Sequence, residues 1–164
     1  MALTARAGWE EQVRGRLSLP VKSAEVIFDG ALVGLQVGGA DDGRVVNWTD
    51  AVTTATITFL GVARVTAGGR ESQDAAIESV TGNAGGTIEV EVDVSGVVLK
   101  SATVVALSAI THVGDLVYAT DENTPTLTAP AGSTPVGFIS RWITGTTGNV
   151  QLFSHGEARA FEGR

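Results

Sequence analysis

The most regular pattern of hydrophobic and polar positions lies between Thr87 and Val94. β-Branched and acidic residues alternate there, in the order Ile88, Glu89, Val90, Glu91, Val92, Asp93 and Val94. Successive side chains of a β-strand point to opposite faces, so this alternation predicts a strand with one aliphatic face and one acidic face. We expect the aliphatic face to lie in a core and the acidic face to meet water.

Shorter apolar runs bounded by Gly, Asp, Asn and Pro predict further strands, giving about eleven in all. These runs are residues 24–28, 31–37, 44–48, 56–66, 97–100, 116–120, 124–128, 136–143 and 149–153. The Asp29-Gly30 pair predicts a hairpin between the first two runs. Gly61 predicts a β-bulge or a close backbone approach. Residues 70–79 fit either a helix or a surface loop.

Two short stretches recur along the chain. Residues 30–33 (GALV) match 114–117 (GDLV) at a spacing of 84, and residues 60–62 (LGV) match 136–138 (VGF) at a spacing of 76. The matches are too few to claim a duplication. They are what two similar β-meanders that close one barrel or sandwich would show.

Composition supports an all-β fold. The 164 residues include 22 Val, 19 Thr and 21 Gly, and 43% of the chain is hydrophobic. This length suits a single domain, and the Val and Thr content suits pleated strands joined by tight turns. We therefore predict a single-domain β-barrel or β-sandwich over residues 23–154, with an N-terminal arm over 1–22 and a C-terminal tail over 155–164.

The arm differs from the rest of the chain in charge. Residues 1–22 carry +2 while the whole chain carries −7, so the remaining residues carry −9. Residues 10–17 have some helical propensity, but Gly15 and Pro20 make an isolated helix marginal. Extended, the arm would reach a neighbouring subunit, and a frayed terminus is the alternative. The residues predicted to contact a partner are Arg6, Trp9, Arg14 and Arg16.

Charge and cysteine content exclude several classes of function. Eleven basic and eighteen acidic residues argue against binding a nucleic-acid backbone. The absence of cysteine removes disulfides, thiolate nucleophiles and thiolate metal sites. Neither a signal peptide nor a membrane-spanning run is visible, so we expect synthesis in the cytoplasm and no membrane partner.

No set of residues with a catalytic spacing is found. The two histidines, His112 and His155, lack a metal-ligand spacing, and Ser154 beside His155 is an adjacent pair that a strand would separate. Acidic pairs such as Asp41-Asp42 fit turn chemistry better than a calcium loop or a glycosidase site. We therefore expect no enzyme activity, no cofactor and no metal.

Several strand-and-turn motifs, in this order, are similar to one family. The run from Val113 to Glu122 (VGDLVYATDE), the Thr-rich residues 124–128, residues 135–139 (PVGFI) and the closing run 149–153 (NVQLF) resemble the capsid cement, or head decoration, proteins of tailed bacteriophages. Residues 27–33 and 59–63 are similar to the opening strands of such proteins. The resemblance covers roughly residues 20–153.

The resemblance implies a structural role without chemistry. Proteins of that family are small, β-rich, commonly trimeric, and bind the outside of the phage head, where they hold neighbouring capsomers together. It therefore implies a homotrimer on the outer surface of a virion, with the major capsid protein as partner. The alternative is a β-sandwich carbohydrate-binding module of a phage fibre or surface protein, which would present Trp48, Tyr118 or Trp142 for sugar stacking.

Overall fold

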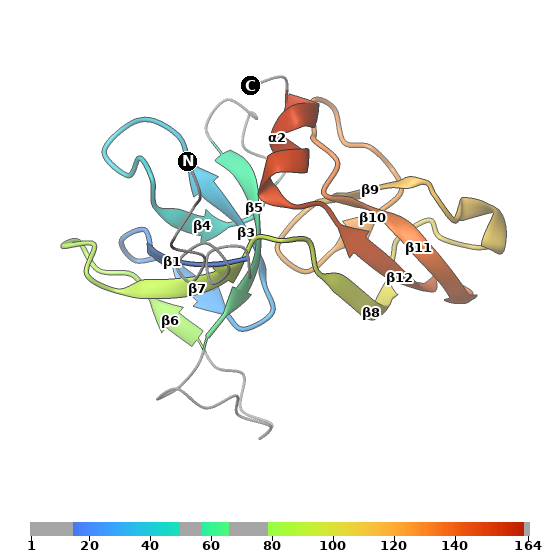
Figure 1. Cartoon of the computed structure of the whole chain (residues 1–164), viewed down its shortest axis with the longest axis horizontal. Coiled ribbons are helices and arrows are strands. Elements are labelled where there is room, and N and C mark those ends of the chain that lie inside the picture. The colour runs from blue at the N-terminus through green and yellow to red at the C-terminus, as the bar shows by residue number, and fades with distance from the viewer. Residues whose placement is uncertain (1–14, 50–56, 66–78, 163–164) are drawn as a thin grey trace, which may run out of the picture.

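The computed structural model describes residues 15–49, 57–65 and 79–162 (Figure 1). Within these residues the chain forms twelve short strands, one 3₁₀ turn and one C-terminal helix, which confirms the all-β prediction. The strands are β1 (Arg16–Pro20), β2 (Val26–Phe28), β3 (Leu32–Gln36), β4 (Val45–Asn47), β5 (Ile57–Arg64), β6 (Ser79–Thr81), β7 (Glu89–Asp93), β8 (Val98–Thr103), β9 (Leu116–Ala119), β10 (Pro125–Thr126), β11 (Gly137–Thr144) and β12 (Thr147–Leu152). The helical elements are η2 (Ile110–His112) and α2 (His155–Glu162).

Ten of these strands form two five-stranded antiparallel sheets. The first sheet has the order β1-β7-β5-β3-β4 and the second the order β10-β9-β11-β12-β8, while β2 pairs only with β6. In Figure 1 the first sheet lies on the left and the second on the right, with α2 above the junction. We call β1, β3, β4, β5 and β7 the first unit, and β8 to β12 the second unit.

The two units have the same topology. Numbered along the chain within each unit, the strands lie side by side in the order first, fifth, fourth, second, third in both sheets. The registers agree as well. Leu32 lies opposite Val62 in the first unit, and Leu116 lies opposite Phe138 in the second. These pairs come from the two short stretches that recur in the sequence, so the recurrence reflects equivalent positions in two similar sheets rather than two halves of one sheet.

Each unit also closes in the same way. After β1, Val21 forms a parallel bridge to Val45 of β4, and after β8, Val105 forms a parallel bridge to Thr126 of β10. In each case the chain that follows the first strand reaches the third strand, at the opposite edge of the sheet. The two sheets are therefore curled rather than flat.

Two hydrophobic clusters hold the molecule together. The smaller lies within the first unit and includes Val33, Val92 and Ile27 of β2. The larger is shared, because it contains Leu32 and Val62 of the first unit, residues of the second unit, and Ala158 of α2. The face of the first sheet that carries Leu32 is thus buried against the second unit and α2.

Two local predictions are confirmed in detail. In β7, Val90 and Val92 are buried while Glu89 and Glu91 are exposed. The register of β5 against β3 shifts next to Gly61, which has a φ of +154°, and a side chain at Gly61 would collide with the carbonyl of Asp93. Gly61 therefore supplies both the predicted bulge and the predicted close approach.

The predicted hairpin is wrong. β2 pairs with β6, and β3 pairs with β4 and β5, so the Asp29-Gly30 turn joins strands of different sheets. Ile27 is fully buried in the core of the first unit while its neighbours Val26 and Phe28 are exposed. The packing of Ile27 against that core, together with pairing to β6, holds β2 away from β3.

Two segments assigned outside the β domain have regular structure. Residues 16–20 form β1, in which Leu17 and Leu19 lie opposite Val92 and Val90. Residues 155–162 form α2. Most of residues 70–79, whose structure the sequence leaves open, lie outside the described residues.

Candidate functional site

Of the four predicted partner-contact residues, only one can be placed. Arg6, Trp9 and Arg14 lie outside the described residues. Arg16 is in β1, and its guanidinium lies 3.6 Å from the carboxylate of Glu91 on β7, with both side chains about half exposed. A surface ion pair of this kind contributes little to stability, so the charge of Arg16 remains accessible to a partner.

The structure shows an exposed apolar loop that was not predicted from the sequence. The loop of residues 108–115 contains η2 and lies at the end of the molecule farthest from the first unit (Figure 1). Ile110 is 67% exposed, the highest value among the exposed large hydrophobic side chains of the described residues, and Val113 is 45% exposed. We call Ile110 and Val113 the apolar tip.

A chain of side-chain contacts braces this loop. The Oγ of Ser108 lies 3.3 Å from Nε2 of His112, and Nδ1 of the same ring lies 2.9 Å from a carboxylate oxygen of Asp115. The order Ser, His, Asp is that of an acyl-transfer relay. All three residues come from one short loop, however, and more than half of the Asp115 side chain is exposed, so water competes for its carboxylate. The arrangement is best suited to fixing the loop that carries the apolar tip.

A second apolar area lies on the outer face of the second unit. Leu116 of β9 is the cross-strand partner of Phe138 of β11. The ring of Phe153 lies 6.1 Å from that of Phe138 and stacks at 4.9 Å on that of Phe161, which is 52% exposed. We call Leu116, Phe138, Phe153 and Phe161 the aromatic surface. Phe161 is not among the residues predicted from the sequence, because the tail was not expected to fold.

The aromatic residues named for sugar stacking lie elsewhere. Trp48 is buried, its indole N–H donates to the carbonyl of Ala119 at 2.9 Å, and its ring meets that of Phe59 edge-on. The indole N–H of Trp142 donates to the carbonyl of Gly145 at 3.0 Å, and its ring packs partly against the larger core. Tyr118 is half-buried. Trp48 is therefore not available to stack on a ligand.

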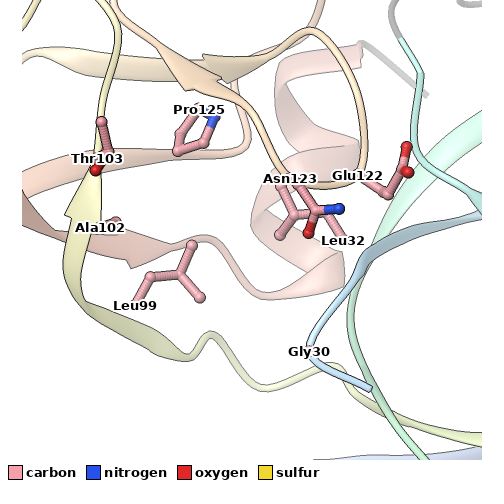
Figure 2. A pocket seen from close by; sticks show the side chains of 8 residues that line it. All are labelled: Gly30, Leu32, Leu99, Ala102, Thr103, Glu122, Asn123 and Pro125. Carbon is pink, nitrogen blue, oxygen red and sulfur yellow. The ribbon is translucent and has the colours of Figure 1, made fainter. Parts of the chain in front are cut away.

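A cavity of about 360 Å³ lies between the two units (Figure 2). Gly30 and Leu32 line it from the first unit, and β8 and the β9–β10 region line it from the second. The backbone N–H of Leu32 donates to the carbonyl of Glu122 at 2.9 Å beside it. Its lining is mostly apolar, with Thr103, Glu122 and Asn123 as the polar groups. We interpret it as part of the joint between the units.

The described residues contain neither a metal-binding cluster nor a membrane-spanning helix. Residues 15–49, 57–65 and 79–162 bring no three His, Asp or Glu side chains together in a way that could hold a metal ion. None of the helices in these ranges is long and apolar enough to cross a membrane.

Comparisons of the chain with protein-family models, with curated proteins and with solved structures find no match.

Proposed function

We propose that this protein is a structural component of a virus particle, a decoration protein of the tailed-bacteriophage type. It binds the outer surface of the head as a homotrimer, with the major capsid protein as its partner, and it stabilises contacts between capsomers. It is made in the host cytoplasm, contacts neither nucleic acid nor a membrane directly, and catalyses no reaction. The resemblance of residues 20–153 to cement proteins is the starting point of this proposal.

The observation that carries the proposal furthest is the braced apolar tip. A rigid loop that holds Ile110 and Val113 in water costs little conformational entropy when it docks, because its contacts are already formed. Exposed aliphatic side chains in one place favour a protein partner. Arg6, Trp9, Arg14 and Arg16 add the charged and aromatic contacts of the arm in this proposal.

Weak individual contacts are sufficient for such a protein. A trimer whose three tips match the symmetry of the shell binds by avidity, which raises the overall affinity by orders of magnitude without any new contact. The two curled sheets and their shared core give the rigidity that simultaneous engagement requires.

The direct test is density-gradient sedimentation of a lysate from the native source, with fractions probed for this protein and for DNA-filled particles. Co-migration with capsid-sized particles in high salt is the expected result. Absence of the protein from every particle fraction would overturn the proposal. Light scattering of the purified protein tests the trimer in solution.

Two variants locate the contact on the shell. Replacing Ile110 and Val113 by Ser should reduce co-migration by about tenfold or more, since each buried aliphatic side chain contributes roughly 1.5–3 kcal/mol. Val37→Ser in the first unit is the matched control, because Val37 is also exposed. For the arm, deletion must stop at residue 14, because removing residues 16–20 would remove β1 from the first sheet.

The carbohydrate-binding module is the second candidate, because two of the aromatic residues named for it, Tyr118 and Trp142, are half-buried rather than fully buried. Tryptophan fluorescence that responds to members of a glycan panel would favour it over the decoration protein.

A further inference from the structure

We propose that residues 1–14 of this chain pack on the aromatic surface of their own second unit, with Trp9 against Phe138, Phe153 and Phe161. This inference goes beyond the proposed function, since it concerns the free protein and requires no shell. The segment would cover the aromatic surface, which the described residues leave partly exposed to solvent.

The first argument is the equivalence of the two units. The shared strand order and register place Leu116 and Phe138 where the first unit has Leu32 and Val62. The backbone agrees, because Gly30 N–H donates to Ala63 and Gly114 N–H donates to Ile139 at the same point of each sheet. Leu32 and Val62 are 2% and 1% exposed in the shared core, whereas Leu116 is 39% exposed. The face that is covered in the first unit is therefore open in the second.

The second argument is the place where the described chain begins. The carbonyl of Gly15 accepts a hydrogen bond from the N–H of Val94, and the carbonyl of Val94 accepts one from the N–H of His155. His155 begins α2 and follows Phe153 by two residues. Two hydrogen bonds therefore link Gly15, where the described chain begins, to the N-terminal residue of α2, close to Phe153.

The third argument is reach. Five residues separate Trp9 from Gly15, and the six extended residue steps between them span at most about 20 Å. The aromatic surface is compact, because its three rings follow one another at 6.1 and 4.9 Å. In this proposal the segment is long enough to bring Trp9 to Phe153, whose ring neighbours the other two, and Trp adds more apolar area per residue than any other side chain.

A second copy of the chain is a poorer occupant. In the first unit, Leu32 is covered by the core-facing side of the second unit. In a second copy that side is already buried in its own core, so among the described residues the copy has no equivalent face with which to cover Leu116. A tethered segment also has an effective concentration in the millimolar range, which favours it over a separate molecule.

The chain contains no cysteine, so two introduced cysteines can form a disulfide only with each other or with those of another copy. In the full-length protein, Glu10→Cys is combined with Leu116→Cys, and in the matched control with Val37→Cys, which has the same 39% exposure but lies in the first unit. Under mild oxidation of the purified protein we expect an intramolecular disulfide at Leu116 that forms at least about tenfold faster than at Val37. Adding Trp9→Ser should slow it by about tenfold, the effect of losing about 1.4 kcal/mol.

Three outcomes would overturn this inference. These are equal rates for the two pairs, a rate that Trp9→Ser does not change, and disulfide-linked dimers in place of crosslinked monomers, which would assign the surface to the arm of another copy. Because no particles are present, the result is independent of the sedimentation experiment, and the decoration proposal stands if this inference fails. If the inference holds, the contacts of the arm with the shell are left to Arg6, Arg14 and Arg16.

Discussion

At the scale of single residues, Ser154 and Glu157 decide where α2 begins. The backbone N–H and the hydroxyl of Ser154 both donate to one carboxylate oxygen of Glu157 at 2.8 Å, and the N–H of Glu157 points back to the Ser154 hydroxyl at 3.3 Å. This reciprocal pairing is a capping box. The hydrogen bond from the backbone of Ser154, followed by the one from its hydroxyl, holds the pKa of Glu157 below its ordinary value.

The lowered pKa predicts an acid-dependent contribution to stability. Because the folded protein favours the charged form, the contribution is complete above the ordinary pKa of about 4.3 and is lost as the pH falls through the lower folded value. We expect Glu157→Gln to melt at a slightly lower temperature than the unchanged protein at pH 7. The difference should shrink as the pH falls below that ordinary pKa and disappear once the pH is below the lower folded value. Thermal unfolding followed by circular dichroism across this range measures it, and a difference that grows with acidity would contradict the assignment.

At the scale of elements, β5 is the strand on which the first unit depends. It pairs with β3 on one side and with β7 on the other, and seven of its eight residues are buried. Leu60 and Val62 are two residues apart and would face the same side of a regular strand, but the bulge at Gly61 lets β5 bring them into different cores. Gly61 therefore links a backbone conformation to the separation of the two clusters.

Alanine substitutions at Gly30 and Gly61 should distinguish the cost of backbone strain from the cost of a steric collision. Gly30 has a φ of +79° with open space around it, so Gly30→Ala should cost about 1 kcal/mol from strain alone. Gly61→Ala adds a collision with the carbonyl group of Asp93. Because that group is backbone, it cannot move aside as a flexible side chain could, and the loss of stability should be at least twice as large. Urea unfolding of both variants compares them, and equal losses would show that β5 and β7 can separate without penalty.

The strands themselves were predictable because their signals are local. Alternation in residues 87–94 and the turn residues around the other runs place nearly every strand of the second unit within a few residues. Strand pairing was not predictable in the same way. β2 pairs with β6, which lies about fifty residues later in the sequence, and no local pattern distinguishes this long-range pairing from a hairpin between β2 and β3. The three-residue β6 has too little sequence to alternate visibly.

The candidate site was predictable only in part. The arm residues Arg6, Trp9 and Arg14 remain predictions. The S-x-x-E signal of Ser154 and Glu157 was present and would have predicted α2, and with it the position of Phe161. The contacts among Ser108, His112 and Asp115 depend on the 3₁₀ turn between them, which brings residues spaced by four and three together. A search restricted to known catalytic motifs does not find such a spacing.

At the scale of the whole molecule, the two units are similar in topology but are not independent. The indole N–H of Trp48 donates to the carbonyl of Ala119 across the junction, and Thr49 forms a bridge to Asp121 beside it. From the C-terminal end, Nδ1 of His155 lies 2.8 Å from the carbonyl of Phe59 in β5. The larger core joins side chains from both sheets and α2. Loss of either unit would expose that core.

This sharing predicts a single cooperative unfolding transition. Val92 and Val150 are equivalent positions, opposite Ala63 and Ile139 in the two sheets, and both are fully buried, although Val92 lies in the smaller core and Val150 in the larger. Each Val→Ala change should cost about 2 kcal/mol and move the same calorimetric peak. If the units unfolded separately, Val92→Ala would shift one peak and leave another in place. A single peak in both variants, with equal calorimetric and van't Hoff enthalpies, means that both units stay folded or unfold together, which is the rigidity that docking at several points of a surface requires.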